Sequence, residues 1–174
     1  NHQPGYNIYF ERDNIPDAIT CMNTYGYCVI RSMIDRGMVD ALKDSIDETL
    51  DPKRDMPENS NRNHLAFAEV SKPLWKLVEH SPYLNFLHQV LRTKDICLHR
   101  SATILRTAGE PFVRWHTDTR ADVKTPREAS DFLNCHGLPS GAWFYLNGSH
   151  PDSSGIAVIE NSHAPDWEGP EGFE

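Results

Sequence analysis

The residues with the clearest chemical potential are His116 and Asp118, in the segment Arg114-Trp115-His116-Thr117-Asp118. In an extended strand, side chains two positions apart project to the same side, so one imidazole nitrogen and one carboxylate oxygen can reach a common point. A His-x-Asp pair joined by a more distant His builds the 2-His-1-carboxylate site of non-haem iron, which leaves coordination positions open for substrate and oxygen. The tripeptide alone also fits a solvated pair at a strand end, so its context matters.

The segments around this pair are predicted to be strands. Residues 96–106 alternate and are rich in β-prone side chains, a turn follows at 107–111, and 112–115 form a shorter strand. Residues 126–140 are predicted as a loop with weak helical character, and 141–146 and 155–159 as two further strands.

Helices dominate the first half of the predicted structure. A short strand at 25–30 precedes a helix that begins after Ser32 or Asp35 and ends near Leu50. Residues 51–63 are polar and predicted as a loop, and helical pieces begin at Lys72-Pro73 and Ser81-Pro82. Helices followed by strands predict a mostly β or α+β domain with a helical buttress.

Several segments together resemble the phytanoyl-CoA dioxygenase-like family of Fe(II)/2-oxoglutarate oxygenases. The opening Gly26-Tyr27-Cys28-Val29-Ile30-Arg31 before a helix is similar to that family's first strand. The stretch GIAVIENSH, residues 155–163, is similar to its Gly-x-x-x-Val-Ile-Pro-Gly-Ser-His motif, with two rather than three residues between Gly155 and Val158 and with Glu160-Asn161 in place of Pro-Gly. The resemblance covers most of residues 25–165.

The resemblance implies a double-stranded β-helix, or jelly roll, that binds Fe(II) and 2-oxoglutarate and hydroxylates a small organic substrate. His116 and Asp118 then correspond to the first two iron ligands, and they are the residues on which catalysis depends. Trp143 corresponds to an aromatic residue beside the cosubstrate. Three residues that share one face of the strand before the turn are candidates for cosubstrate contacts: His99, Ser101 and Thr103.

The chain departs from the family pattern near its end. The family's second iron-binding His and the Arg that pairs with 2-oxoglutarate are expected beyond Glu174, and no Lys or Arg follows Arg127. About four jelly-roll strands are predicted after residue 95, whereas a jelly roll has about eight. We therefore expect residues 1–174 to be the N-terminal part of one domain, with 1–95 as strand plus helices and 96–174 as the first half of the β-helix.

Charge and cysteine content argue against several other function classes. Residues 1–127 hold all 17 Lys and Arg and 17 of the 25 acidic residues, whereas every Lys, Arg, Asp or Glu position in 128–174 is an Asp or a Glu. This distribution lacks the basic face that nucleic acids or anionic membranes require. The four cysteines form no CxxC pair and no secretory signal is visible, so we expect reduced thiols in a cytoplasmic protein. A secreted module with two disulfides is the lesser alternative.

The sequence also allows other interpretations of His116 and Asp118. A third ligand could come from His163, His136 or His150, although each also fits a loop or turn residue. The chain could be a non-catalytic jelly-roll module that binds a small molecule, or it could hold zinc or nickel in a hydrolase or isomerase of cupin type. The sequence identifies neither the substrate nor the oligomeric state.

Overall fold

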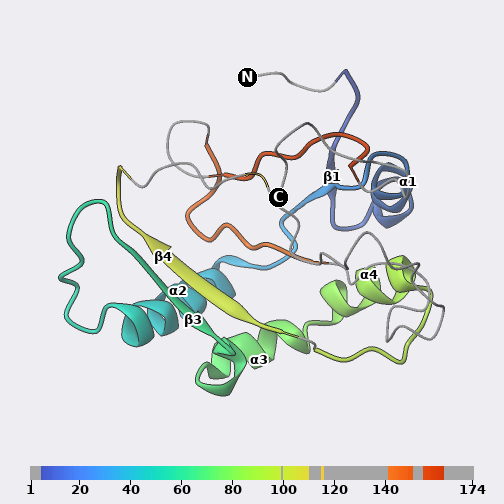
Figure 1. Cartoon of the computed structure of the whole chain (residues 1–174). Helices are drawn as coiled ribbons and strands as arrows, with labels where there is room; N and C mark the ends of the chain where they lie inside the picture. The colour runs from blue at the N-terminus through green and yellow to red at the C-terminus, as the bar shows by residue number, and fades with distance from the viewer. Residues whose placement is uncertain (1–4, 99, 110–114, 116–140, 151–154, 163–174) are drawn as a thin grey trace, which may run out of the picture.

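Four helices and two small sheets make up the part of the protein that the structure describes. The computed structural model describes residues 5–98, 100–109, 115, 141–150 and 155–162. Along these residues the order is β1, α1, β2, α2, β3, a short 3-10 helix, α3, α4 and β4 (Figure 1). The chain is therefore a mixed α/β protein, and no closed barrel is formed by the described segments.

The N-terminal layer is a β-α-β unit. Strand β1 (Tyr9–Glu11) pairs in parallel with β2 (Val29–Arg31), with Phe10 opposite Ile30, and α1 (Ile15–Tyr25) connects them. Pro16 lies in the first turn of α1, where its missing N–H costs nothing. The helix ends at Gly26, whose φ of 88° lets its N–H donate to the Met22 carbonyl at 2.9 Å.

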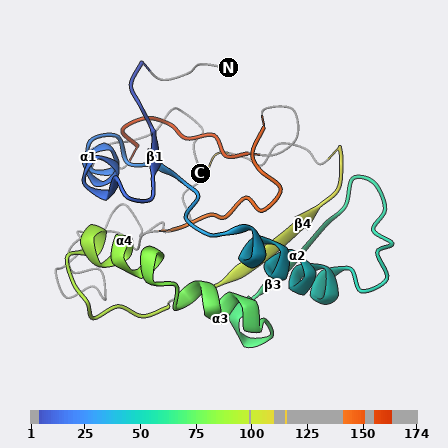
Figure 2. The ribbon, with the colours of Figure 1, turned by 180° about the vertical axis from the view of Figure 1, so that it is seen from behind.

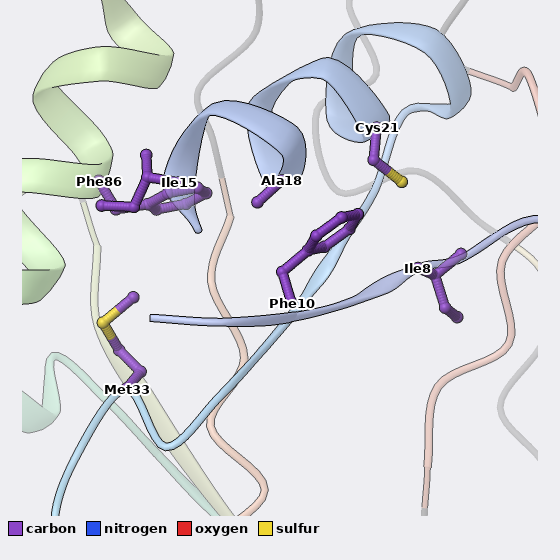
Figure 3. Packing of buried hydrophobic residues seen from close by; sticks show 7 residues of the cluster. All are labelled: Ile8, Phe10, Ile15, Ala18, Cys21, Met33 and Phe86. Atoms are coloured by element: carbon purple, nitrogen blue, oxygen red, sulfur yellow. The ribbon is translucent and has the colours of Figure 1, made fainter. Parts of the chain in front are cut away.

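This layer encloses a hydrophobic core. Phe10 of β1 packs among Ile15, Ala18 and Cys21 of α1, with Ala18 completely buried (Figure 3). Met33, just after β2, and Phe86 of α4 (Ser81–Leu91) close the cluster. The predicted helix at 81 is thus confirmed, and it contributes its buried aromatic ring to the N-terminal layer.

The other predicted helices are also confirmed. Helix α2 spans Arg36–Leu50, and the Asp35 side chain caps it by accepting a hydrogen bond from the Met38 N–H at 2.8 Å. Helix α3 spans Lys72–Val78, with the buried Ser71 hydroxyl accepting from the Leu74 N–H. Helix α4 begins at Ser81 as predicted, and its N-cap residue, His80, forms no side-chain cap.

A second, antiparallel sheet joins β3 (Asn61–Leu65) to β4 (Ala102–Arg106). His64 lies opposite Thr103 and Arg62 opposite Leu105. Helix α2 lies against one face of this pair, behind the strands in Figure 1 and in front of them in Figure 2. On that face Arg62 donates to the Leu50 carbonyl at 2.8 Å and lies 3.6 Å from Asp51, which ties the sheet to the end of α2.

Several predicted strands are wrong or shorter than expected. Residues 25 and 26 end α1, so only Val29–Arg31 form the predicted first strand. The predicted strand 96–106 is limited to Ala102–Arg106, and the predicted loop 51–63 contains the start of β3. Residues 141–146 and 155–159 are not in strands, because among the described residues no partner strand supplies their hydrogen bonds. The predicted strand at 112–115 and loop at 126–140 lie outside the described residues, apart from Trp115.

Within the described ranges, none of the helices combines the length and the apolar character that crossing a bilayer requires.

Arg62 is expected to stabilise the junction of β3 with α2. Replacing it with Ala removes a charge-assisted hydrogen bond to the last helical carbonyl, and we expect the free energy of unfolding to fall by about 1–2 kcal/mol. The control is Arg36→Ala, which breaks an exposed ion pair with Asp40 and should cost under about 0.5 kcal/mol. Urea denaturation measures both, and equal losses in the two variants would contradict the assigned role of Arg62.

Candidate functional site

The two residues predicted to bind metal, His116 and Asp118, lie outside the described residues. So do His99, His136 and His163. The structure does describe the chain that leads to the pair, through β4, and two later segments at 141–150 and 155–162. The described part of the candidate site therefore consists of the elements that flank the pair in sequence.

Thr103 lies on the side of β4 that faces α2, and Ser101, the residue before the strand, contacts the segment at 66–68. Thr103 is only 6% exposed and lies opposite His64 in the register. The Ser101 hydroxyl accepts a hydrogen bond from the Ala68 N–H at 2.9 Å, and its carbonyl accepts from the Ala66 N–H at 2.8 Å. Both candidates for cosubstrate contacts thus lie between the sheet and the helical half of the chain.

Trp143 lies in an extended segment with no strand pairing among the described residues. Its side chain is 56% exposed, whereas the ring of the next residue, Phe144, packs edge-on against Tyr83 of α4 with centroids 5.3 Å apart. Phe144 also packs against the hydrophobic core of the N-terminal layer. Because neighbouring side chains of an extended chain point to opposite sides, Phe144 anchors the segment and directs Trp143 outward.

A tight turn follows the extended residues 155–159. The Ser162 N–H donates to the Ile159 carbonyl at 3.3 Å, and Asn161 has a φ of 60°. Positive φ at the third residue alone is the pattern of a type II turn, which favours Pro at the second position and Gly or Asn at the third. Glu160 and Asn161 occupy these two positions. The turn therefore has the conformation that a Pro-Gly pair would specify.

Glu160, in this turn, contributes to the electrostatic environment of Tyr6 in the N-terminal layer. The hydroxyl of Tyr6 lies 3.3 Å from the hydroxyl of Tyr27, within hydrogen-bond distance. The Tyr6 ring stacks on Tyr25 with centroids 3.5 Å apart. Burial, the hydrogen bond with Tyr27 and the nearby Glu160 raise the pKa of Tyr6 well above its usual value, so its hydroxyl remains protonated at neutral pH.

A group of hydrogen bonds, which we call the latch, holds the chain just before the predicted metal pair. Thr107 donates its N–H to the Ser60 carbonyl at 3.1 Å, and its hydroxyl accepts from the Ser60 N–H at 2.9 Å. The Asn59 N–H donates to the Ala108 carbonyl at 3.1 Å. Gly109 follows with a φ of 86°, a conformation that side chains rarely adopt. The latch fixes the backbone a few residues before His116.

The remaining potential donors in the described part of the chain do not form a metal site. No group of three His, Cys, Asp or Glu side chains there is arranged to hold an ion. Cys21, Cys28 and Cys97 are free, and Cys135 lies outside the described residues. Burial raises the pKa of the Cys21 thiol, and burial together with Cys21 raises the pKa of Cys28 to about 11. These two thiols are therefore protonated and poor nucleophiles at neutral pH.

Comparison with known proteins identifies no relative. No protein-family model matches the sequence, and neither the curated proteins nor the solved structures contain a match.

The sequence predicts a turn at 107–111 but does not indicate that this turn hydrogen-bonds to residues 59 and 60. The signals of the latch are Thr107 and Gly109, since a Gly after a strand marks a backbone position with positive φ. The side of β4 that faces α2 was harder to predict, because the alternation along the strand indicates two faces without saying which one a helix covers.

Gly109 is expected to be essential for the latch. A Cβ at this position would overlap the Asn59 amide and would also adopt an unfavourable positive φ. We therefore expect Gly109→Ala to lower the free energy of unfolding by about 1–3 kcal/mol. Gly141→Ala is the matched control, because nothing lies within 4 Å of a Cβ there. Chemical denaturation that finds both variants equally stable would show that Gly109 is not constrained.

The positive φ of Asn161 in the turn at 159–162 leads to a second prediction about the stability of the protein. Asn161→Gly removes the strain of a positive φ and should leave stability unchanged or raise it by up to about 1 kcal/mol. Asn161→Val should lower it by about 1–2 kcal/mol, because a β-branched residue is disfavoured at this φ. Asn147→Val, at an exposed residue with negative φ, is the control. Thermal unfolding compares the three variants, and Asn161→Val proving as stable as Asn147→Val would contradict the assigned turn.

Proposed function

We propose that this chain belongs to a non-haem Fe(II)- and 2-oxoglutarate-dependent dioxygenase of the phytanoyl-CoA dioxygenase-like type, in which His116 and Asp118 bind the iron. The proposed fold is a jelly roll buttressed by α1 to α4. The proposal begins from the resemblance in sequence, and the geometry of the segments that flank the pair supports it.

The observation that carries the proposal is the turn at 159–162. The resemblance equates Glu160-Asn161 with a Pro-Gly pair, although neither residue type is the same. Pro and Gly at these positions specify a type II turn. The backbone of this chain has the corresponding hydrogen bond and the positive φ at Asn161, and Asn is the residue that best replaces Gly there. The match in conformation supports the alignment independently of residue identity.

The donor types at the pair suit the proposed metal. One imidazole nitrogen and one carboxylate oxygen, with a second His as the third ligand, form the facial triad that non-haem Fe(II) oxygenases use. When bound, iron supplies the redox chemistry that couples oxidation of 2-oxoglutarate to hydroxylation of the substrate. His116 binds through a neutral ring nitrogen and Asp118 through its ionised carboxylate, so metal affinity should fall as the pH falls.

The remaining contributions of the chain are positional. The latch holds the backbone before His116, and the contact of Phe144 with Tyr83 joins the later segment to the N-terminal layer. Trp143 directs an exposed ring away from the core, where it can form one wall of the cosubstrate site. Such walls exclude water and limit where a substrate can lie.

The decisive variants are His116→Ala and Asp118→Ala. Each removes one of the proposed protein ligands, and we expect Fe(II)-dependent formation of succinate from 2-oxoglutarate to fall at least about 100-fold. His88→Ala, in α4, is the control and should retain the activity of the unchanged protein. Succinate is measured with and without Fe(II), alongside the far-ultraviolet circular dichroism of each variant. Unchanged turnover in folded His116→Ala would contradict the proposal.

A further inference from the structure

Two cysteines face the same hydrophobic core from either side of the turn between α1 and β2. Cys21 lies in the C-terminal half of α1 and is 5% exposed, and Cys28 directly precedes β2 and is half-buried. Val29 is 39% exposed, whereas Cys28 and Ile30 both pack against the core that contains Cys21. Because side chains alternate along an extended chain, Cys28 and Ile30 project together toward this core.

The sulfur of Cys21 lies close to the backbone of Cys28. It is 3.5 Å from the carbonyl oxygen of Tyr27, the residue before Cys28. In a planar peptide a carbonyl oxygen is about 2.8 Å from the next Cα, so the Cys21 Sγ is within about 6 Å of the Cys28 Cα. Figure 3 shows Cys21 beside the chain that leads into β2. Since Cys28 faces the same core, rotation of its side chain moves its sulfur toward that of Cys21.

The two thiols also affect each other's ionisation. Burial and the charge of Cys21 raise the pKa of Cys28 to about 11, and burial raises the pKa of Cys21. The thiolate is the reactive form of cysteine in disulfide exchange, so the pair reacts slowly at neutral pH and faster as the pH rises. Burial therefore slows oxidation of the pair without preventing it.

We propose that Cys21 and Cys28 form an oxidisable dithiol, which a small disulfide such as oxidised glutathione converts into an internal disulfide between α1 and β2. The thiolate of Cys28, the more exposed of the two, attacks the glutathione disulfide, forms a mixed disulfide and releases one glutathione. The Cys21 thiolate then attacks the Cys28 sulfur, which forms the internal bond and releases the second glutathione. Two electrons pass from the cysteines to the oxidant, and the two thiol protons end on the two released glutathione molecules.

The internal bond closes a short loop around Gly26, the residue at which α1 ends. Closing this loop restricts the unfolded chain, so the midpoint of thermal unfolding should rise by about 5–10 °C in the oxidised protein. The inference is independent of the proposed oxygenase activity, because neither cysteine belongs to the proposed iron site.

Peptide mapping of the whole chain tests the inference. The protein is incubated with oxidised glutathione at pH 7, 8 and 9, and free thiols are then blocked with iodoacetamide. Trypsin releases residues 13–31, which contain Cys21 and Cys28 and no other cysteine. The predicted peptide has lost two hydrogens and carries neither glutathione nor an alkyl group. Its rate of formation should rise about 10-fold per pH unit, because this range lies below the pKa of Cys28, about 11.

Single variants separate the two thiols. Cys21→Ser should carry one glutathione on Cys28, and Cys28→Ser should leave the buried Cys21 unmodified. Cys97→Ser is the control, because it removes an exposed thiol from another segment and should leave the internal link unchanged.

Two results of the mapping would overturn the inference, namely glutathione on Cys28 of the unchanged protein without the internal link, and no reaction up to pH 9. A linked protein that unfolds at a lower temperature than the reduced protein would also overturn it, since the folded chain would then not accommodate the bond.

Discussion

The antiparallel register between β3 and β4, with α2 covering one face, is the constraint on which the rest of the structure depends. Because side chains alternate along a strand, fixing His64 opposite Thr103 determines which residues face the helix and which face outward. Arg62 holds this register against the end of α2, and the latch between Ser60 and Thr107 lies at the same end of the strand pair, with Ser60 two residues before Arg62. The same register exposes Ile104 and Arg106 on the side away from α2.

The N-terminal β-α-β unit provides the second fixed point. Its core is built on Phe10, Ala18 and Phe86, and two later segments are fastened to its surface. Phe144 packs on Tyr83, and Glu160 contributes to the electrostatic environment of Tyr6. Residues near the two ends of the described chain are joined in this way. Segments without strand pairing of their own are thus held in place by side-chain contacts to a layer that precedes them in sequence.

Helices could be predicted where the periodicity of apolar residues agrees with a capping residue or a proline at the start. Strands could not be predicted where their formation depends on pairing with a distant strand. Helix α2 combines periodic apolar residues with an Asp35 cap, and α3 and α4 each begin beside a proline. Helix α1 was missed although Asn14-Ile15-Pro16 marks its start. Strand β3 could not be predicted, because its Asn-Arg-Asn-His sequence has low β propensity and forms a strand only by pairing with β4. Residues 141–146 have the right composition for a strand but, among the described residues, no partner.

The chemistry of the site stays a prediction from residue types, since the His-x-Asp spacing indicates a donor set and both residues lie outside the described part of the chain. The central claim is that this pair holds an iron ion to which 2-oxoglutarate binds. Anaerobic addition of 2-oxoglutarate to the Fe(II)-loaded protein, followed by visible absorption, tests it most directly. A charge-transfer band that requires both Fe(II) and 2-oxoglutarate and is absent from His116→Ala is the predicted result. No band in the unchanged protein, or the same band in the variant, would contradict the account.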